Sequence, residues 1–190
     1  MDIGTSQRVC GLLSRLLEYP SSEWRQHLPA AREMAAEIAA ADAEAARHIE
    51  AFLNAAESAG EIAWQEQYVR TFDFGRTTNL YLTYEQHGEE RERGAALLAW
   101  KRRYAEAGFI LEDGELADYL PLVLEFAASA SWSAAQEVLA WSRPALHSIR
   151  LSLAEAGSPY TGLFELLLQI VPEAPAELAA EPTLTGRGDN

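Results

Sequence analysis

Cysteine is nearly absent from this chain, which has a single copy, Cys10, in 190 residues. One cysteine cannot form an intramolecular disulfide, and it cannot supply the thiolate cluster that structural zinc or an iron–sulfur group requires. Because Cys10 stands beside Val9, Leu12 and Leu13 in an apolar pattern, we predict a buried structural thiol rather than a reactive one.

Long apolar runs and a basic amino-terminal segment are missing as well. No hydrophobic stretch approaches the ~20 residues that cross a bilayer, and residues 1–8 lack the basic start and apolar core of a secretory signal. We therefore expect a soluble cytoplasmic protein with no direct membrane insertion.

Positive charge is scarce, with 15 lysines and arginines against 29 aspartates and glutamates. The formal net charge of −14 and the pI of about 4.6 repel phosphate backbones and anionic lipid head groups. Nucleic acid is therefore not an expected partner, whereas a basic partner is electrostatically favoured.

The common catalytic and metal-binding motifs are not found. The four histidines are far apart and none lies in a His-Glu-x-x-His pattern, and there is no glycine-rich phosphate loop and no Gly-x-Ser-x-Gly elbow. His87 could form an acid–base cluster with Glu85 and Glu89, but a histidine at a helix end more often bonds the chain or pairs with a carboxylate. We therefore predict no enzymatic activity, no catalytic residue, no metal site and no bound cofactor.

Strand-forming residues are sparse, and what is present is typical of helices. Alanine is abundant and the apolar residues recur with a period near 3.6, which predicts an all-α, single-domain helical bundle. We assign residues 1–171 to this domain. Residues 172–190 are acidic, rich in proline and alanine, and almost without large apolar side chains, so we expect a disordered tail.

Prolines and glycines mark the expected helix ends. The first expected helix stops before Tyr19-Pro20, and the last covers residues 159–171. Two others are expected over 61–72, with Ile62 facing inward, and over 115–128, with Leu116 facing inward. A further helix is expected to start at Ser142, with Pro144 in its first turn.

The most distinctive stretch lies after residue 78, where an aromatic-apolar run meets a block of alternating charge. It reads Asn79-Leu-Tyr-Leu-Thr-Tyr-Glu-Gln-His-Gly-Glu-Glu-Arg-Glu-Arg-Gly94. Gly88 separates the two parts, which predicts a sharp break between two helical segments. Residue types alone are also compatible with an ordinary helix end followed by a solvated, salt-bridged helix.

This stretch resembles the signature of the nitrate reductase delta subunit family, the NarJ-type assembly chaperones for molybdenum enzymes. In that family an aromatic-leucine helix runs into a charged segment that holds a His-Gly-Glu and an Arg-Gly, as His87-Gly88-Glu89 and Arg93-Gly94 do here. The resemblance extends to Gln67-Tyr-Val-Arg-Thr-Phe72 before it and to Glu115-Leu-Ala-Asp-Tyr-Leu-Pro121 after it.

The later segment separates branches of the wider superfamily, which includes TorD-like and DmsD-like chaperones. There it usually reads Glu-x-Pro-Asp-His, whereas this chain has Ala117 in place of the proline and Tyr119 in place of the histidine. The departure favours the NarJ branch and argues against a role that depends on a histidine at that position.

The resemblance implies a function and partners. A NarJ-type chaperone binds the N-terminal leader of the apo catalytic (alpha) subunit of respiratory nitrate reductase and supports molybdenum cofactor insertion before membrane docking. Molybdenum cofactor biosynthesis proteins are further candidate partners. The alternatives are a chaperone for another molybdoenzyme of the dimethyl sulfoxide or trimethylamine oxide reductase type, a non-catalytic helical adaptor, and a hydrolase that uses the His87 region.

A groove for a basic amphipathic peptide helix needs an apolar floor and an acidic rim. Asp118, Leu122 and Glu125 are expected on one helical stripe that could form it, although Leu122 and the tyrosines could instead be ordinary core. The candidate peptide-binding residues are Tyr81, Tyr84, Glu85, His87, Glu89, Arg91, Asp118, Tyr119, Leu122 and Glu125, and Gly88 and Gly94 are expected to set the helix break.

Overall fold

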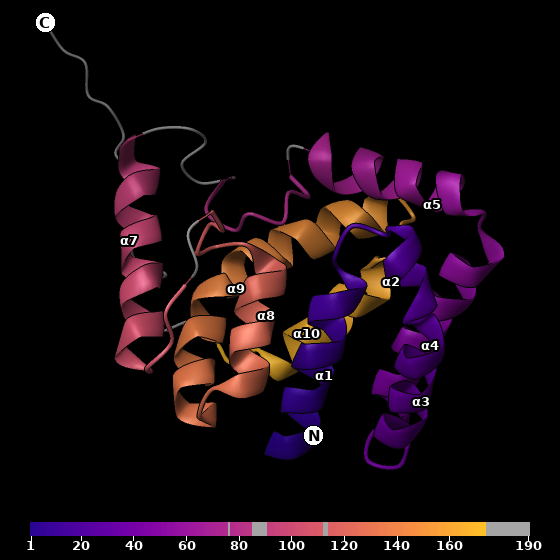
Figure 1. Cartoon of the computed structure of the whole chain (residues 1–190), viewed down its shortest axis with the longest axis horizontal. Coiled ribbons are helices and arrows are strands. Elements are labelled where there is room, and N and C mark those ends of the chain that lie inside the picture. Colours follow the sequence, from indigo (N-terminus) through magenta and orange to yellow (C-terminus); the bar gives the residue numbers. More distant parts are fainter. Residues whose placement is uncertain (76, 85–90, 112–113, 174–190) are drawn as a thin grey trace, which may run out of the picture.

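The computed structural model describes residues 1–75, 77–84, 91–111 and 114–173 (Figure 1). Over this part of the chain it is helical and has no β-strand, which confirms the all-α prediction. Its elements are α1 (Ile3–Leu16), α2 (Ser22–Gln26), α3 (Leu28–Ala39), α4 (Ala43–Ser58), α5 (Glu61–Tyr68), the π-helical turn η1 (Val69–Asp73), α7 (Arg91–Glu106), α8 (Leu120–Ser129), α9 (Trp132–Glu155) and α10 (Thr161–Ile170). None of the helices in these ranges combines the length and the hydropathy needed to cross a membrane.

Side chains that cap N-termini explain where four of the helices begin. Asp2, Ser21, Asp42 and Ser131 each accept a hydrogen bond from a backbone N–H in the first turn of the helix that follows. Such a cap satisfies a donor that has no partner within the helix. Local sequence therefore fixes these helix starts.

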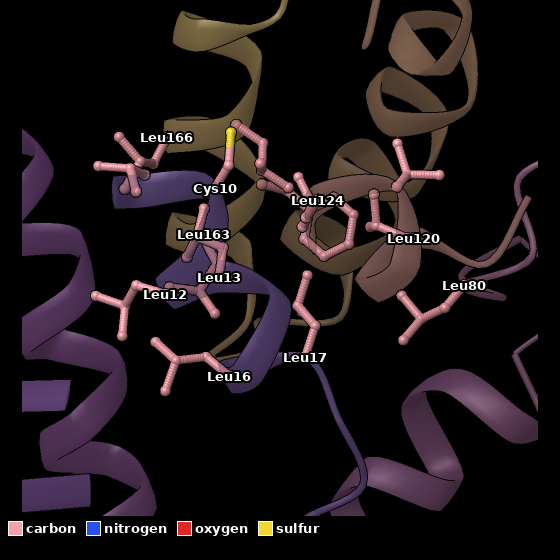
Figure 2. Packing of buried hydrophobic residues seen from close by; sticks show 14 of the residues in the cluster. Cys10, Leu12, Leu13, Leu16, Leu17, Leu80, Leu120, Leu124, Leu163 and Leu166 are labelled. Atoms are coloured by element: carbon pink, nitrogen blue, oxygen red, sulfur yellow. The ribbon is translucent and has the colours of Figure 1, made fainter. Parts of the chain in front are cut away.

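Helix α1 lies at the centre of the hydrophobic core, where it packs mainly on α8. Leu13 of α1 and Leu17, which directly follows α1, are buried beside Leu124 of α8 and Leu163 of α10 (Figure 2). Cys10 is fully buried in the same cluster, which confirms the predicted structural thiol, and burial raises its pKa to about 12. Around α1, α3 packs mainly on α4, and α9 packs on both α10 and α8.

An aromatic cluster holds α5 and η1 against the rest of the molecule. The ring of Tyr160 lies with its centroid 5.5 Å from Trp64, 4.8 Å from Phe72 and 5.0 Å from Phe52. Aromatic pairs at such separations stabilise by about 0.5–1.5 kcal/mol beyond the area that they bury. One face of α5 and η1 is thus buried in the core, and the opposite face is exposed to solvent.

The predicted helix start at Ser142 is wrong, because α9 continues through Pro144 as one helix. Pro144 lies on the exposed side of α9, whereas Leu139, Leu146 and Ile149 are buried on the opposite side. Packing of this apolar face on both sides of the proline offsets the lost backbone hydrogen bond, so tertiary contacts override the local signal.

Two other helices are shorter than predicted. The segment expected over 115–128 becomes helical only at Leu120, and Leu116 is 37% exposed instead of facing inward. The segment expected over 61–72 ends as an α-helix at Tyr68 and widens into the π-helical turn η1, and Ile62 is 72% exposed instead of inward. The last helix, α10, agrees with its predicted bounds to within two residues. Gly88 and the expected tail from residue 174 onward lie outside the described residues.

Candidate functional site

A two-residue bridge joins the two segments that the sequence marks as distinctive. Tyr81 and Tyr119 lie opposite each other in an isolated antiparallel bridge. The Leu82 N–H donates to the Asp118 carbonyl at 3.0 Å, and the Leu120 N–H donates to the Leu80 carbonyl at 2.8 Å. This pairing uses the Asp118 carbonyl and the Leu120 N–H, which explains why the backbone at Tyr119, directly before α8, is extended and not helical.

Asp118 organises this junction from within. It is fully buried, and its Oδ2 accepts hydrogen bonds from the backbone N–H of Thr83 at 3.0 Å and from the Thr83 hydroxyl at 2.6 Å. The expectation that Asp118 shares an exposed helical stripe with Leu122 and Glu125 is therefore wrong. The prediction fails because the Tyr81–Tyr119 bridge keeps Asp118 in an extended segment, and α8 begins only after it, at Leu120.

Arg93, from the first turns of α7, completes the junction. Its Nη2 lies 3.6 Å from the Asp118 Oδ2, and its Nε donates to the Thr83 hydroxyl at 3.3 Å. The guanidinium carbon lies 5.8 Å from the ring centre of Tyr81 and 5.4 Å from that of Tyr84. A cation above aromatic faces stabilises by about 0.5–2 kcal/mol, depending on its desolvation. The contacts tie the start of α7 to the aromatic run.

A groove opens beside Tyr119, with a volume of about 770 Å³. It lies between the C-terminal end of α1, the chain that follows α7, and one face of α8. Its lining residues are Ser14, Glu18, Tyr19, Ser21, Tyr104, Phe109, Ile110, Leu111, Glu115, Tyr119, Pro121, Leu122, Glu125, Phe126 and Ser129. A volume of this size falls in the range of pockets that bind organic ligands.

The floor of the groove is rigid and apolar. Phe126 lies with its ring centre 4.7 Å from that of Tyr104 and 5.0 Å from that of Phe109. The Tyr104 hydroxyl also donates to the Ala117 carbonyl at 2.8 Å, which fixes α7 to the segment before α8. Above this floor Ile110 is 94% exposed, although a side chain of its type is normally buried.

The charges that line the groove are all negative. Among its described lining residues the charged groups are Glu18, Glu115 and Glu125, and none is a lysine, arginine or histidine. Glu18 pairs with Arg15 at 3.1 Å, and both side chains are largely exposed. An apolar floor with carboxylates around it attracts a partner that carries apolar and basic side chains together.

Tyr119 is held in place on the wall of the groove. Its ring lies 5.1 Å from that of Tyr81, and burial raises its pKa. The Tyr68 hydroxyl donates to the Leu17 carbonyl at 3.0 Å, at the end of α1. These contacts keep the neutral phenol of Tyr119 oriented on the groove wall.

The structure brings together only some of the predicted site residues. Tyr81, Tyr84, Asp118 and Tyr119 meet at the junction, and Tyr119, Leu122 and Glu125 line the groove. Glu85, His87, Gly88 and Glu89 lie outside the described residues, as does the side chain of Arg91. Gly94 lies within α7 with open space around it, so the expectation that it sets a helix break is wrong.

Several functional candidates could not be found from the sequence. Thr83 and Arg93 carry no signal of their own beyond their place in the distinctive stretch. Glu18, Tyr19 and Ile110 come from segments that are far apart along the chain and meet only in the folded protein. A helical hydrophobic pattern predicts which residues are buried but not which elements converge on one groove.

Comparisons with known proteins give a consistent result. Residues 35–165 match the family model described as nitrate reductase delta subunit. The chain is 40% identical over 168 residues to the probable nitrate reductase molybdenum cofactor assembly chaperone NarJ of Bacillus subtilis, which covers 88% of this chain and 90% of that protein. It is 38% identical over 162 residues to the nitrate reductase molybdenum cofactor assembly chaperone NarJ of Escherichia coli K12, which covers 84% of this chain and 67% of that protein.

Proposed function

The chain belongs to the nitrate reductase delta subunit family, and from this membership we propose that it is an assembly chaperone for a respiratory nitrate reductase. In this proposal it binds the N-terminal leader of the apo catalytic subunit and supports insertion of the molybdenum cofactor before that subunit docks at the membrane. The names of the relatives favour nitrate reductase over a dimethyl sulfoxide or trimethylamine oxide reductase as the client.

The observation that carries the proposal is the groove beside Tyr119. Its exposed Ile110, half-buried Leu122 and aromatic floor offer apolar surface that a monomer would otherwise leave to water. The acidic side chains around that surface suit a leader that forms an amphipathic helix with basic residues on its flanks. Apolar contacts would supply most of the affinity, and the carboxylates would supply orientation and association rate.

The same chemistry supports binding rather than catalysis. Burial raises the pKa of Tyr104 on the groove floor above its ordinary value, so this phenol stays protonated and serves as a hydrogen-bond donor. A carboxylate-lined groove with aromatic walls recognises a basic helix without any bond being made or broken. We therefore assign the groove a binding role and give this chain no part in the chemistry of the cofactor.

The proposal can be tested in cells that carry the cognate nitrate reductase but lack this chain. Wild-type protein should restore both nitrate reductase activity and the molybdenum content of the purified catalytic subunit. Leu122→Asp, which places a charge on the apolar floor, should leave the subunit without molybdenum even when it accumulates to the wild-type level. Leu151→Asp is the matched control, because Leu151 is 43% exposed and does not line the groove.

Two outcomes would contradict the proposal. If wild-type protein did not restore the molybdenum content, the proposed chaperone function would be wrong. If Leu122→Asp restored it as completely as Leu151→Asp, the groove would have no role in that function.

A further inference from the structure

A second apolar surface lies on the outer side of α5 and η1. It surrounds a shallow hollow of about 480 Å³ lined by Tyr19, Ile62, Gln65, Glu66, Val69, Arg70 and Phe74. Phe74 is 79% exposed, Ile62 is 72% exposed and Tyr19 is 48% exposed. Three large apolar side chains gathered on one hollow indicate an interaction surface more than scattered exposed residues do.

The π-helical turn explains how this surface is built. Phe72 points inward, 2% exposed, and packs on Tyr160, whereas Phe74 at the end of η1 points into solvent. The Phe74 N–H donates to the Val69 carbonyl at 3.1 Å, which closes the wide turn. Such turns are rare and are found often at functional sites. Here the turn leaves one aromatic ring in the core and presents the other to the hollow.

The hollow and the acidic groove meet at Tyr19, which lines both. The ring of Tyr19 packs edge-on against that of Tyr68 at 5.6 Å, and the Tyr68 hydroxyl donates to the Leu17 carbonyl at the end of α1. The Gln65 side chain donates to the Pro20 carbonyl at 3.1 Å, so α5 is fixed next to the end of α1 (Figure 1). The two surfaces therefore adjoin each other at the ring of Tyr19.

We propose that the hollow binds the apolar continuation of the same basic, amphipathic segment that enters the groove, so that this segment crosses Tyr19 and ends on Ile62 and Phe74. The inference rests on the proposed function, because it extends the leader-binding groove. It defines a longer recognition segment of two parts, one basic and amphipathic and one apolar.

The charges favour this occupant. The groove holds three glutamates and no cation among its described lining residues, whereas the hollow holds one glutamate, Glu66, and one arginine, Arg70. The groove therefore selects positive charge, and the hollow, being balanced, selects apolar side chains. A second copy of this chain, which has a net charge of −14, would bring like charge to the acidic groove next to the hollow.

The test uses full-length protein and a nested series of synthetic peptides from the N-terminus of the catalytic subunit, shortened stepwise from either end. Calorimetry gives the affinity of each peptide for wild-type protein, for Ile62→Ser/Phe74→Ser and for Leu122→Asp. Leu98→Ser/Leu151→Ser is the matched control, because both leucines are exposed and line neither the groove nor the hollow. Thermal melts should be unchanged for the two double-serine variants, since they alter only exposed side chains.

We expect Ile62→Ser/Phe74→Ser to bind the longest peptide about ten-fold more weakly than wild type, which corresponds to the loss of two partly buried apolar contacts. The same variant should bind peptides trimmed at one end with wild-type affinity, because those peptides no longer reach the hollow. Leu122→Asp should lose affinity for every peptide that retains the basic, groove-binding part.

Three results would overturn the inference, and they differ from one another. Equal affinities of wild type and Ile62→Ser/Phe74→Ser for all peptides would show that the hollow does not bind the peptide, while leaving the groove and the proposed function intact. Unchanged peptide affinity together with loss of a dimer in sedimentation would assign the hollow to a second copy of the chain. No binding of any peptide by wild-type protein would overturn the inference and the leader-binding part of the proposed function together.

Discussion

Asp118 holds Thr83 through two hydrogen bonds, one from the backbone N–H at 3.0 Å and one from the hydroxyl at 2.6 Å, across 35 positions of sequence. The carboxylate is fully buried, and Arg93 is the cation beside it. A buried carboxylate needs both hydrogen bonds and an opposite charge to offset its desolvation. Asp118 therefore acts as the fixed point from which the Tyr81–Tyr119 bridge and the start of α8 are positioned.

The first prediction concerns this carboxylate. Asp118→Asn keeps an acceptor oxygen for Thr83 but leaves the guanidinium of Arg93 without its counter-charge, so the free energy of unfolding should fall by about 1–3 kcal/mol. Urea denaturation measures it. Glu125→Gln, which neutralises an exposed carboxylate, should stay within about 0.5 kcal/mol of wild type. Equal midpoints for the two variants would show that Asp118 does not organise the junction.

The second prediction concerns alkaline pH. The Cys10 thiol ionises near 9.0 when exposed and near 12 when buried in the fold. Between these values the unfolded chain binds fewer protons than the native one, so the stability contributed by the thiol falls as pH rises from about 9 towards 12. Denaturation midpoints at pH 8 to 10.5 should therefore decline less steeply in Cys10→Ala than in wild type. Parallel declines would mean that the thiol ionises equally in both states.

The third prediction concerns the chain after α10. Arg143 donates to the carbonyls of Leu168 and Val171 and pairs with Glu173 at 2.7 Å, so ordered contacts extend at least to residue 173. Deleting 174–190 should leave the melting temperature within about 3 °C of wild type, whereas Arg143→Ala should lower it by more than that. A large destabilisation by the deletion alone would contradict the prediction that the tail contributes nothing to the core.

Much of the fold could be predicted from local signals. The helical class follows from composition and period, and the burial of Cys10 follows from its neighbours Val9, Leu12 and Leu13. Proline and helix-capping residues are less decisive when packing competes with them. Pro144 stays inside α9 because apolar residues are buried on both sides of it, and the helix predicted from Glu115 gives way to a backbone bridge with Leu80 and Leu82.

The candidate site was predicted in part, and for identifiable reasons. Tyr119, Leu122 and Glu125 were named from a helical stripe and the resemblance, and they do line one groove. Asp118 was placed on the same stripe because sequence gives no sign that the backbone there is extended. Tyr19 and Ile110 reach the groove from elements far away in sequence, so only the tertiary arrangement shows them.

The fourth prediction separates the roles of charge and apolar contact in leader binding. Glu125 is exposed at the edge of the groove, so Glu125→Gln should slow association two- to five-fold, within the about ten-fold range typical of rim charges, and leave dissociation unchanged. Stopped-flow fluorescence at low and physiological salt measures both rates. Glu155→Gln, an exposed acid outside the groove, is the control. A faster dissociation rate instead would place Glu125 in a desolvated contact with the leader.

The most direct test of leader binding is calorimetric titration of the purified chain with the N-terminal leader of the catalytic subunit. Wild-type protein and the control Leu151→Asp should bind with a dissociation constant of about 1 μM or tighter, weakened only moderately by salt, and Leu122→Asp should lose about 100-fold or more in affinity. Absence of heat and of any melting-temperature shift at millimolar peptide with wild-type protein, or equal affinity of Leu122→Asp and Leu151→Asp, would contradict the account.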